Sequence, residues 1–222
     1  MKLLIALVIW IAALAGAAEL SSTVAAKYPS ARSSTVSAGS STVSAGSSTV
    51  SAGSNATSTG TAAFDPSSVK SADRLSMFRT PNLAKALRIA RAHLPRNASL
   101  SEAAIYPGYL VLIFDTGGSA REVAIEANGA YSGSTPAGSS GRAHFPLKQL
   151  SAGVPSKLVK EIEASAHVAE SRLGYMVLSA NSGSGPRWQI YPVKSGAVLY
   201  YDASVTGRGL VAWTASGPRP LR

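Results

Sequence analysis

Apolar and polar residues follow two patterns along the chain after residue 62, and these patterns predict helices and strands. In Pro81–Leu94, apolar residues recur every three or four positions, which is the period of a helix with one buried side. Pro155–Ala166 has the same period. Thr80 is a candidate cap for the first helix, and Pro95 ends that helix.

Short apolar or alternating runs follow each helix and predict antiparallel strands. After the first helix they are 99–106, 109–114, 121–126 and a short run from 130; after the second they are 175–179, 187–191, 197–202 and 210–213. Asn128-Gly129 is a strong hairpin signal, and Pro218 and Pro220 are expected in a frayed tail.

The order of these elements predicts an α+β fold with two repeated units. Each unit is a helix followed by three to four antiparallel strands, and each helix covers one face of a sheet. We place the units at 62–135 and 143–216. Because such small units bury too little alone, they are expected to share a core or a continuous sheet.

The first eighteen residues have the features of an export signal. Lys2 is followed by an apolar run to Ala18 that ends in small residues, as in a secretory signal. This run of about 16 residues is shorter than the roughly 20 of a membrane span. Cleavage before Ala18 or Glu19 and a retained anchor both stay open. In either case the rest of the chain is predicted outside the cytoplasmic membrane, with membrane contact through residues 3–18.

Residues 19–61 are predicted to be a disordered linker. The heptapeptide SSTVSAG occurs three times between Ser33 and Gly53, and a decayed copy follows. Uncharged Ser, Gly, Ala and Thr cannot offset the entropy lost on ordering, so a flexible spacer is expected. A glycosylated stalk and a repeat-binding ligand remain alternatives. Asn55 and Asn97 match the N-glycosylation sequon, but in a bacterium these are expected to be chance matches.

Composition narrows the functions further. The chain has 222 residues, no cysteine and a formal net charge of +10. Disulfides, thiolate metal sites and a lipoprotein anchor are therefore excluded. The positive charge favours lipid headgroups or acidic envelope polymers, and nucleic acid is not expected outside the membrane.

The basic residues are concentrated in 69–96, where only Asp73 is acidic. Lys85, Arg88 and Arg91 lie on the polar side of the first predicted helix. We predict that these three residues bind an anionic surface, either a lipid or an acidic partner. The alternative interpretation is a solvated helix face.

No catalytic or metal-binding constellation is convincing. Asp115-Thr116-Gly117 follows an apolar strand and resembles the loop of aspartic peptidases, but a single copy would require a homodimer. A hairpin turn explains the same residues. His93, His144 and His167 lack metal-ligand spacing, so neither a metal nor a cofactor is expected.

Three short motifs resemble those of the penicillin-binding serine acyltransferases: Ser67–Lys70, Ser179–Asn181 and Lys194–Gly196. Their order is right. However, the second and third are too close together, and nothing beside the linker would desolvate Lys70. We do not expect an enzyme of this class.

Aromatic residues cluster in the last strands: Trp188, Tyr191, Tyr200, Tyr201 and Trp213. Alternation sends Trp188 to one face and Tyr191 to the other. Core packing is expected for most of them, and an exposed aromatic strip for a glycan or peptide is the alternative.

The two predicted units resemble PepSY-type modules, which occur outside the membrane in bacteria, and an uncharacterised bacterial envelope family with duplicated units. The resemblance is carried by Leu75–Tyr131, with SMFRTPNLAKALRIARAHLP, and by Phe145–Tyr201, with FPLKQLSAGVPSKLVKEI, GYMVLSA and RWQIYPVKSGAVLYYD. PepSY-type modules are thought to be interaction or inhibitory domains. The resemblance therefore implies an exported, non-enzymatic protein that binds an envelope protein or an anionic polymer or lipid surface. The alternatives are an envelope hydrolase or acyltransferase and a purely structural surface protein.

Overall fold

A computed structural model describes residues 64–116, 119–137, 143–181, 185–194 and 196–221. The predicted signal or anchor at 1–18 and the predicted linker at 19–61 lie outside these residues. Residues 64–222 form one compact unit. Within the described ranges, no helix has the length and hydropathy needed to cross a bilayer.

The described part of the chain contains two α-helices and ten β-strands. The helices are α2 (Thr80–His93) and α3 (Gly153–Ala166). The strands are β1 (Ser99–Ile105), β2 (Tyr109–Asp115), β3 (Ala120–Glu126), β4 (Tyr131–Pro136), β5 (Phe145–Pro146), β6 (Leu173–Asn181), β7 (Gly185–Pro192), β8 (Val198–Ser204), β9 (Val211–Thr214) and β10 (Gly217–Pro220). The 3-10 turns are η1 (Pro66–Ser68), η2 (Leu147–Gln149) and η3 (Glu170–Arg172). The predicted α+β class is confirmed.

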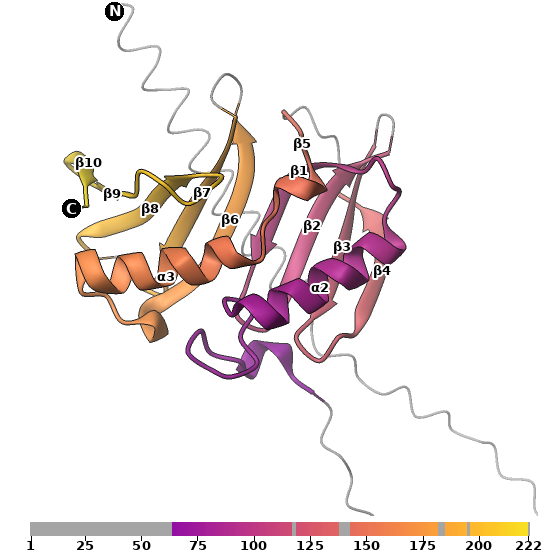
Figure 1. Ribbon diagram of the computed structural model, residues 1–222, viewed down its shortest axis with the longest axis horizontal. Helices are drawn as coiled ribbons and strands as arrows, with labels where there is room; N and C mark the ends of the chain where they lie inside the picture. The colour runs from indigo at the N-terminus through magenta and orange to yellow at the C-terminus, as the bar shows by residue number, and fades with distance from the viewer. Residues whose placement is uncertain (1–63, 117–118, 138–142, 182–184, 195, 222) are drawn as a thin grey trace, which may run out of the picture. The chain divides into compact units, whose positions relative to one another are not determined.

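All ten strands join one antiparallel sheet. Its order is β10-β9-β8-β7-β6-β1-β2-β3-β4, and the short β5 also pairs with β1. The strands that follow α2 form one half and those that follow α3 form the other. The two halves meet where Ile105 of β1 pairs with Met176 of β6. The expectation of a continuous sheet is therefore confirmed, and both helices cover the same face of it (Figure 1).

One hydrophobic core lies between the helices and the sheet. Leu83 and Leu87 of α2 and Leu158 and Ile162 of α3 have at most 1% of their surface exposed. They contact sheet residues such as Trp188, which is fully buried. A buried side chain of this size contributes about 1.5–3 kcal/mol to stability, so the helices are held mainly by this apolar face.

Two predictions about element ends are wrong. Thr80 is not a cap: it is the first residue of α2, and the preceding Arg79 has no side-chain capping bond. Pro218 and Pro220 do not lie in a frayed tail, because β10 pairs with β9 as the last strand of the sheet. Proline is tolerated at a sheet edge, where its missing N–H removes no ladder bond.

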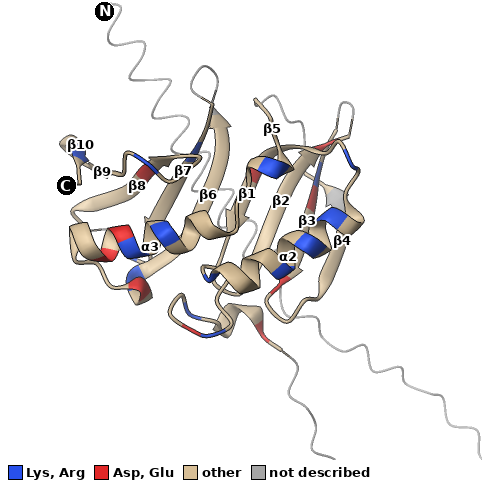
Figure 2. Ribbon diagram, viewed as in Figure 1, with Lys and Arg blue, Asp and Glu red and all other residues tan. Residues whose placement is uncertain are grey.

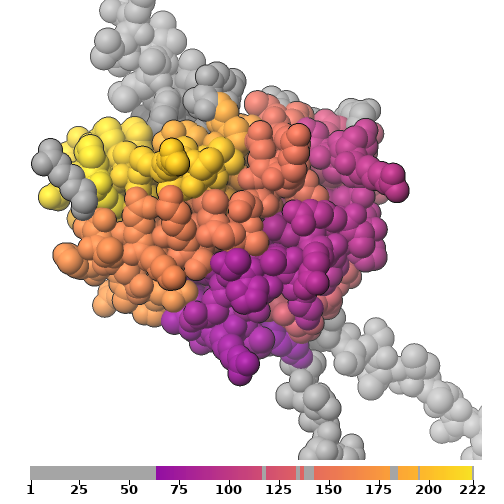
Figure 3. Space-filling view, in the orientation of Figure 1, coloured from indigo at the N-terminus to yellow at the C-terminus, as the bar shows by residue number. Residues whose placement is uncertain are grey.

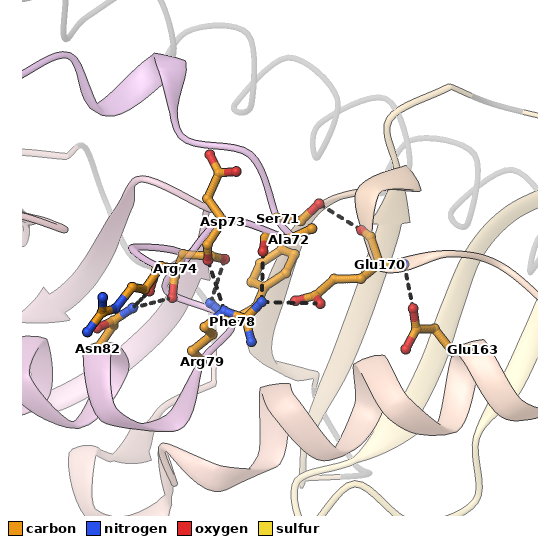
Figure 4. Close-up of polar contacts among 10 residues, drawn as sticks. Ser71, Ala72, Asp73, Arg74, Phe78, Arg79, Asn82, Glu163 and Glu170 are labelled. Carbon is orange, nitrogen blue, oxygen red and sulfur yellow. Dashed lines mark hydrogen bonds and ion pairs between the residues drawn. The ribbon is translucent and has the colours of Figure 1, made fainter.

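The segment 64–79, which we call the strap, joins the two halves before α2 begins. Its Met77 N–H donates to the carbonyl of Pro107 in the β1–β2 turn at 2.7 Å. Its Ser71 hydroxyl donates to the carbonyl of Glu170 in η3, also at 2.7 Å. The Arg79 guanidinium donates to the carbonyls of Ala72 and Asp73 within the strap. It also lies 3.8 Å from the Glu170 carboxylate (Figure 4). The strap therefore fixes the start of α2 against both halves.

Candidate functional site

A surface groove lies between α2 and the segment from η2 to α3. It has a volume of about 580 Å³, and its apolar floor includes Leu87 and Leu150. Arg88 and Arg91 line it from α2, and Lys148 lines it from η2. In the space-filling view these two segments lie side by side on the helix-covered face of the molecule (Figure 3).

The groove is positively charged. No acidic residue lines it. Among the described residues, Arg88, Arg91 and Lys148 form no ion pair with another side chain. The charged residues of α2 are all basic, whereas α3 has both positively and negatively charged residues (Figure 2). Three like charges without a local counter-charge make the groove attractive to anions.

The first turn of α3 adds to this potential. It contains no acidic residue, and its N-cap residue, Ala152, has no side chain that could cap a backbone amide. Ala152 itself lines the groove. The positive end of the helix dipole therefore faces the same region as the three cations.

Of the three basic residues predicted to bind an anionic surface, only two lie together in the groove. Arg88 and Arg91 share the groove, but Lys85 does not line it. The Lys85 ammonium instead donates to the carbonyl of Asn128 at 3.3 Å, in the β3–β4 turn. Because α2 turns by 100° per residue, three positions spaced by three lie on a drifting line and not on one face. Lys85 is thus oriented toward the sheet edge.

Lys148 is the groove residue that the sequence did not indicate. It lies in η2, far along the chain from Arg91, and has no periodic relation to α2. Only the tertiary packing of η2 beside α2 brings it near. Guanidinium groups bind phosphate and carboxylate through two parallel hydrogen bonds, and an ammonium group adds a point charge. Chemically, the groove can therefore hold an oxyanion.

Asp115 lies beside His144, and such an Asp–His pair could act as an acid and a base in catalysis. Its carboxylate lies 3.5 Å from Nε2 of His144, and both side chains are about a quarter exposed. The nearest hydroxyl groups along the chain, those of Thr116 and Ser119, contact each other at 3.4 Å. Asp115 is not among the residues that line the groove beside α2. The pair of Asp115 and His144 therefore lies apart from the groove beside α2.

The acyltransferase-like motifs lie apart in the fold. Ser67 is in η1, where its hydroxyl donates to Asp65 at 2.7 Å. Ser179 is in β6, and Lys194 lies in the turn after β7. No hydrogen bond joins one motif to another among the described residues. Across the same residues, no group of three or more His, Asp or Glu side chains is arranged for a metal ion.

The aromatic cluster is divided between the two faces of the sheet. Trp188 and Tyr201 are fully buried beneath the helices, as core packing predicts. Tyr191, Tyr200 and Trp213 lie on the opposite face, where their rings stack in a row. The alternation in β7 and β8 gives this division directly.

Comparisons with models of protein families, with curated proteins and with solved structures found no match.

Proposed function

We propose that this chain is an exported, non-enzymatic binding protein that holds an anionic component of the bacterial cell envelope in the groove beside α2. The observation that carries the proposal is that Arg88, Arg91 and Lys148 share one groove whose lining has no acidic residue. A phosphate- or carboxylate-bearing polymer or lipid headgroup would neutralise these charges. The apolar floor would exclude water from the contact and so strengthen it.

We further propose that the domain is a duplication of a PepSY-like unit, at 62–135 and 143–216. The support is the order of elements. Each 14-residue helix precedes a run of antiparallel strands, β1–β4 after α2 and β6–β10 after α3, and both runs begin at the centre of the sheet, with β1 beside β6. PepSY-type modules are thought to be interaction domains, which agrees with a binding role by analogy of fold.

The location follows from the N-terminal sequence. Residues 3–18 would act as a signal or as an uncleaved anchor, and 19–61 would hold the domain away from the membrane. A linker of this composition has an r.m.s. span of roughly 30 Å over its repeat segment. Such a spacer would let the groove reach wall polymers or lipid headgroups.

The test is a binding measurement with a triple variant of the full chain. The probes are short-chain polyphosphate in solution and vesicles with or without phosphatidylglycerol. Arg88→Gln, Arg91→Gln and Lys148→Gln together remove about 1 kcal/mol per charge, so affinity should fall on the order of a hundredfold. Polyphosphate binding without vesicle binding would favour a wall polymer over a lipid.

The matched control removes three charges elsewhere. Arg172, Lys194 and Arg208 are exposed and do not line the groove, so their replacement by Gln should change affinity by less than threefold. Equal losses of affinity in the two triple variants would mean that binding depends only on the overall net charge and not on the groove. No binding by the unaltered chain would favour a purely structural surface protein.

One observation favours the second candidate, an envelope hydrolase: the approach of Asp115 to His144. Such an enzyme would use this pair as acid and base. Its test is hydrolysis of peptide and ester substrates by the unaltered chain and by Asp115→Asn. Activity that disappears in the variant would support the hydrolase and contradict the non-enzymatic proposal.

A further inference from the structure

The wall that α2 gives to the groove is divided into an apolar half and a cationic half. Pro81 and Ala84 line the groove from the first two turns of the helix, and Arg88 and Arg91 line it from the next two. At a rise of 1.5 Å per residue, the wall from Pro81 to Arg91 is about 15 Å long. An anion held by the two guanidinium groups therefore has an apolar strip of α2 beside it.

The rest of the lining is also apolar apart from one cation and one hydroxyl group. On the side opposite α2, Lys148 of η2 is followed along the chain by Leu150 and Ala152. Leu87 and Leu150 are each 1% exposed, and they form an apolar floor between the two sides. A ligand that fills the groove therefore contacts apolar side chains as well as the three cations.

The cations of the groove are accessible and match a phosphate group with two charges. Arg88, Arg91 and Lys148 are exposed, and none of them has an ion-pair partner in the part of the chain that the structure describes. A phosphate monoester has a charge of about −1.5 to −2 at pH 7. Three cations complement this charge better than they complement the single charge of a diester or a carboxylate.

The groove offers little to a ligand with many hydroxyl groups. Among the described residues that line it, Ser151 is the only one with a neutral polar side chain. Sugar or polyol hydroxyl groups held against the apolar floor would lose hydrogen bonds to water without replacing them, which weakens binding. An alkyl chain loses no hydrogen bond there and gains free energy from burial. The lining therefore favours a phosphate on an apolar chain over a phosphorylated glycan or polyol.

We propose that the groove binds a lipid phosphate, in which a phosphate group is joined directly to an apolar chain without a sugar or polyol headgroup. This inference rests on the proposed function, because it names the anion that the groove holds. Arg88, Arg91 and Lys148 bind the phosphate oxygens, and the chain lies along Pro81 and Ala84 above the apolar floor. Affinity therefore depends on the chain as well as on the charge.

The test is a series of soluble alkyl phosphates titrated into the isotope-labelled full chain. Butyl, hexyl and octyl phosphate share one headgroup, differ only in chain length and are used at concentrations at which they are monomeric. Binding is followed by backbone amide shifts in residues 81–91 and 147–154, so contact of the alkyl chain with other apolar segments is not counted. Half-burial of a methylene group raises affinity about twofold, so we expect a gain of about fourfold from butyl to hexyl and again from hexyl to octyl.

Two further ligands separate this inference from the proposed function. Octyl glucoside has the chain without the charge and should bind roughly tenfold or more weakly than octyl phosphate, so equal binding would overturn the inference. Short-chain polyphosphate has the charge without the chain. If it binds and the three alkyl phosphates have equal affinities, the groove is an anion site and the lipid phosphate is ruled out. If neither polyphosphate nor any alkyl phosphate binds, the proposed function itself fails.

Ala84→Asn tests the apolar half of the α2 wall. It places an amide group where the chain should lie, so affinity for octyl phosphate should fall roughly fivefold, while affinity for polyphosphate should change by less than about twofold. Ala92→Asn is the matched control, because Ala92 is exposed on the same helix and is not among the residues that line the groove. Equal affinity of the two variants for octyl phosphate would overturn the inference. The chain-length series decides the question if Ala84→Asn does not fold.

Discussion

His167 has a backbone conformation that its side chain disfavours. It follows the last residue of α3 with φ of 54°, in the left-handed region. A residue with a Cβ pays roughly 1–2 kcal/mol there, and glycine does not. The side chain is exposed, so its loss removes little packing.

Glycine relieves this strain, but it also increases the conformational entropy of the unfolded chain, which offsets part of the gain. We therefore expect His167→Gly to raise the melting temperature by about 2 °C. Thermal unfolding of both proteins measures this. His93→Gly, at the last residue of α2, also removes a ring that stacks on Tyr131 at 4.1 Å, so it should lower stability by about 1 kcal/mol and serves as the opposite control. A lower melting temperature for His167→Gly would mean that the imidazole makes a stabilising contact.

The buried phenol groups of Tyr109 and Tyr200 should make the protein less stable at alkaline pH. Burial raises the pKa of Tyr109 and Tyr200 from 10.0 to about 12. In the unfolded chain these phenols ionise near pH 10, so the stability from keeping them neutral is complete below pH 10. It is lost as the pH rises from 10 to 12.

Urea unfolding at pH 8, 10 and 11 measures this loss. We expect the free energy of unfolding to fall between pH 10 and 11, and Tyr200→Phe to reduce the fall because phenylalanine does not ionise. A constant free energy over this range would contradict the burial of the phenols.

At the scale of elements, the strap depends on one glycine in the β1–β2 turn. A Cβ built on Gly108 would lie 1.8 Å from the carbonyl oxygen of Pro66, which is backbone and cannot move alone. Gly108→Ala should therefore destabilise the protein by about 1–3 kcal/mol. Urea unfolding of the variant measures this.

Gly153→Ala is the matched control for that substitution. Gly153 is the first residue of α3, and a Cβ there meets nothing within 4 Å. This change should be neutral or stabilising by about 0.5 kcal/mol, because alanine favours the helix. Equal stability of both variants would show that the strap is not held against the turn.

Local patterns were enough to predict most elements. The period in Pro81–Leu94 and Pro155–Ala166 predicts α2 and α3 to within two residues at each end. Asn128-Gly129 predicts the β3–β4 hairpin, and Gly129 has the positive φ of 97° that such a turn needs. β10 was missed because two prolines suggest a tail, although an edge strand tolerates them.

At the scale of the whole molecule, the sequence could not indicate what long-range packing brings together. Lys148 joins Arg88 only because η2 packs beside α2. Tyr106 and Tyr175 stack beside Tyr191 only because β1 pairs with β6, so the sequence did not group them with Tyr191. Such pairings need the three-dimensional arrangement, because no local period encodes them.

At this scale charge is unevenly distributed between the two helices. The charged side chains of α2 are all basic and two of them line the groove, whereas α3 has residues of both signs (Figure 2). Higher salt should weaken binding to the exposed groove charges.

The most direct test of the groove is a titration of the isotope-labelled full chain with short-chain polyphosphate, followed by backbone amide chemical shifts. We expect saturable shifts in residues 81–91 and 147–154, and their loss in the triple variant of Arg88, Arg91 and Lys148. Shifts spread over exposed basic residues elsewhere, such as Arg172 and Lys194, would contradict the assignment of the groove as the anion site.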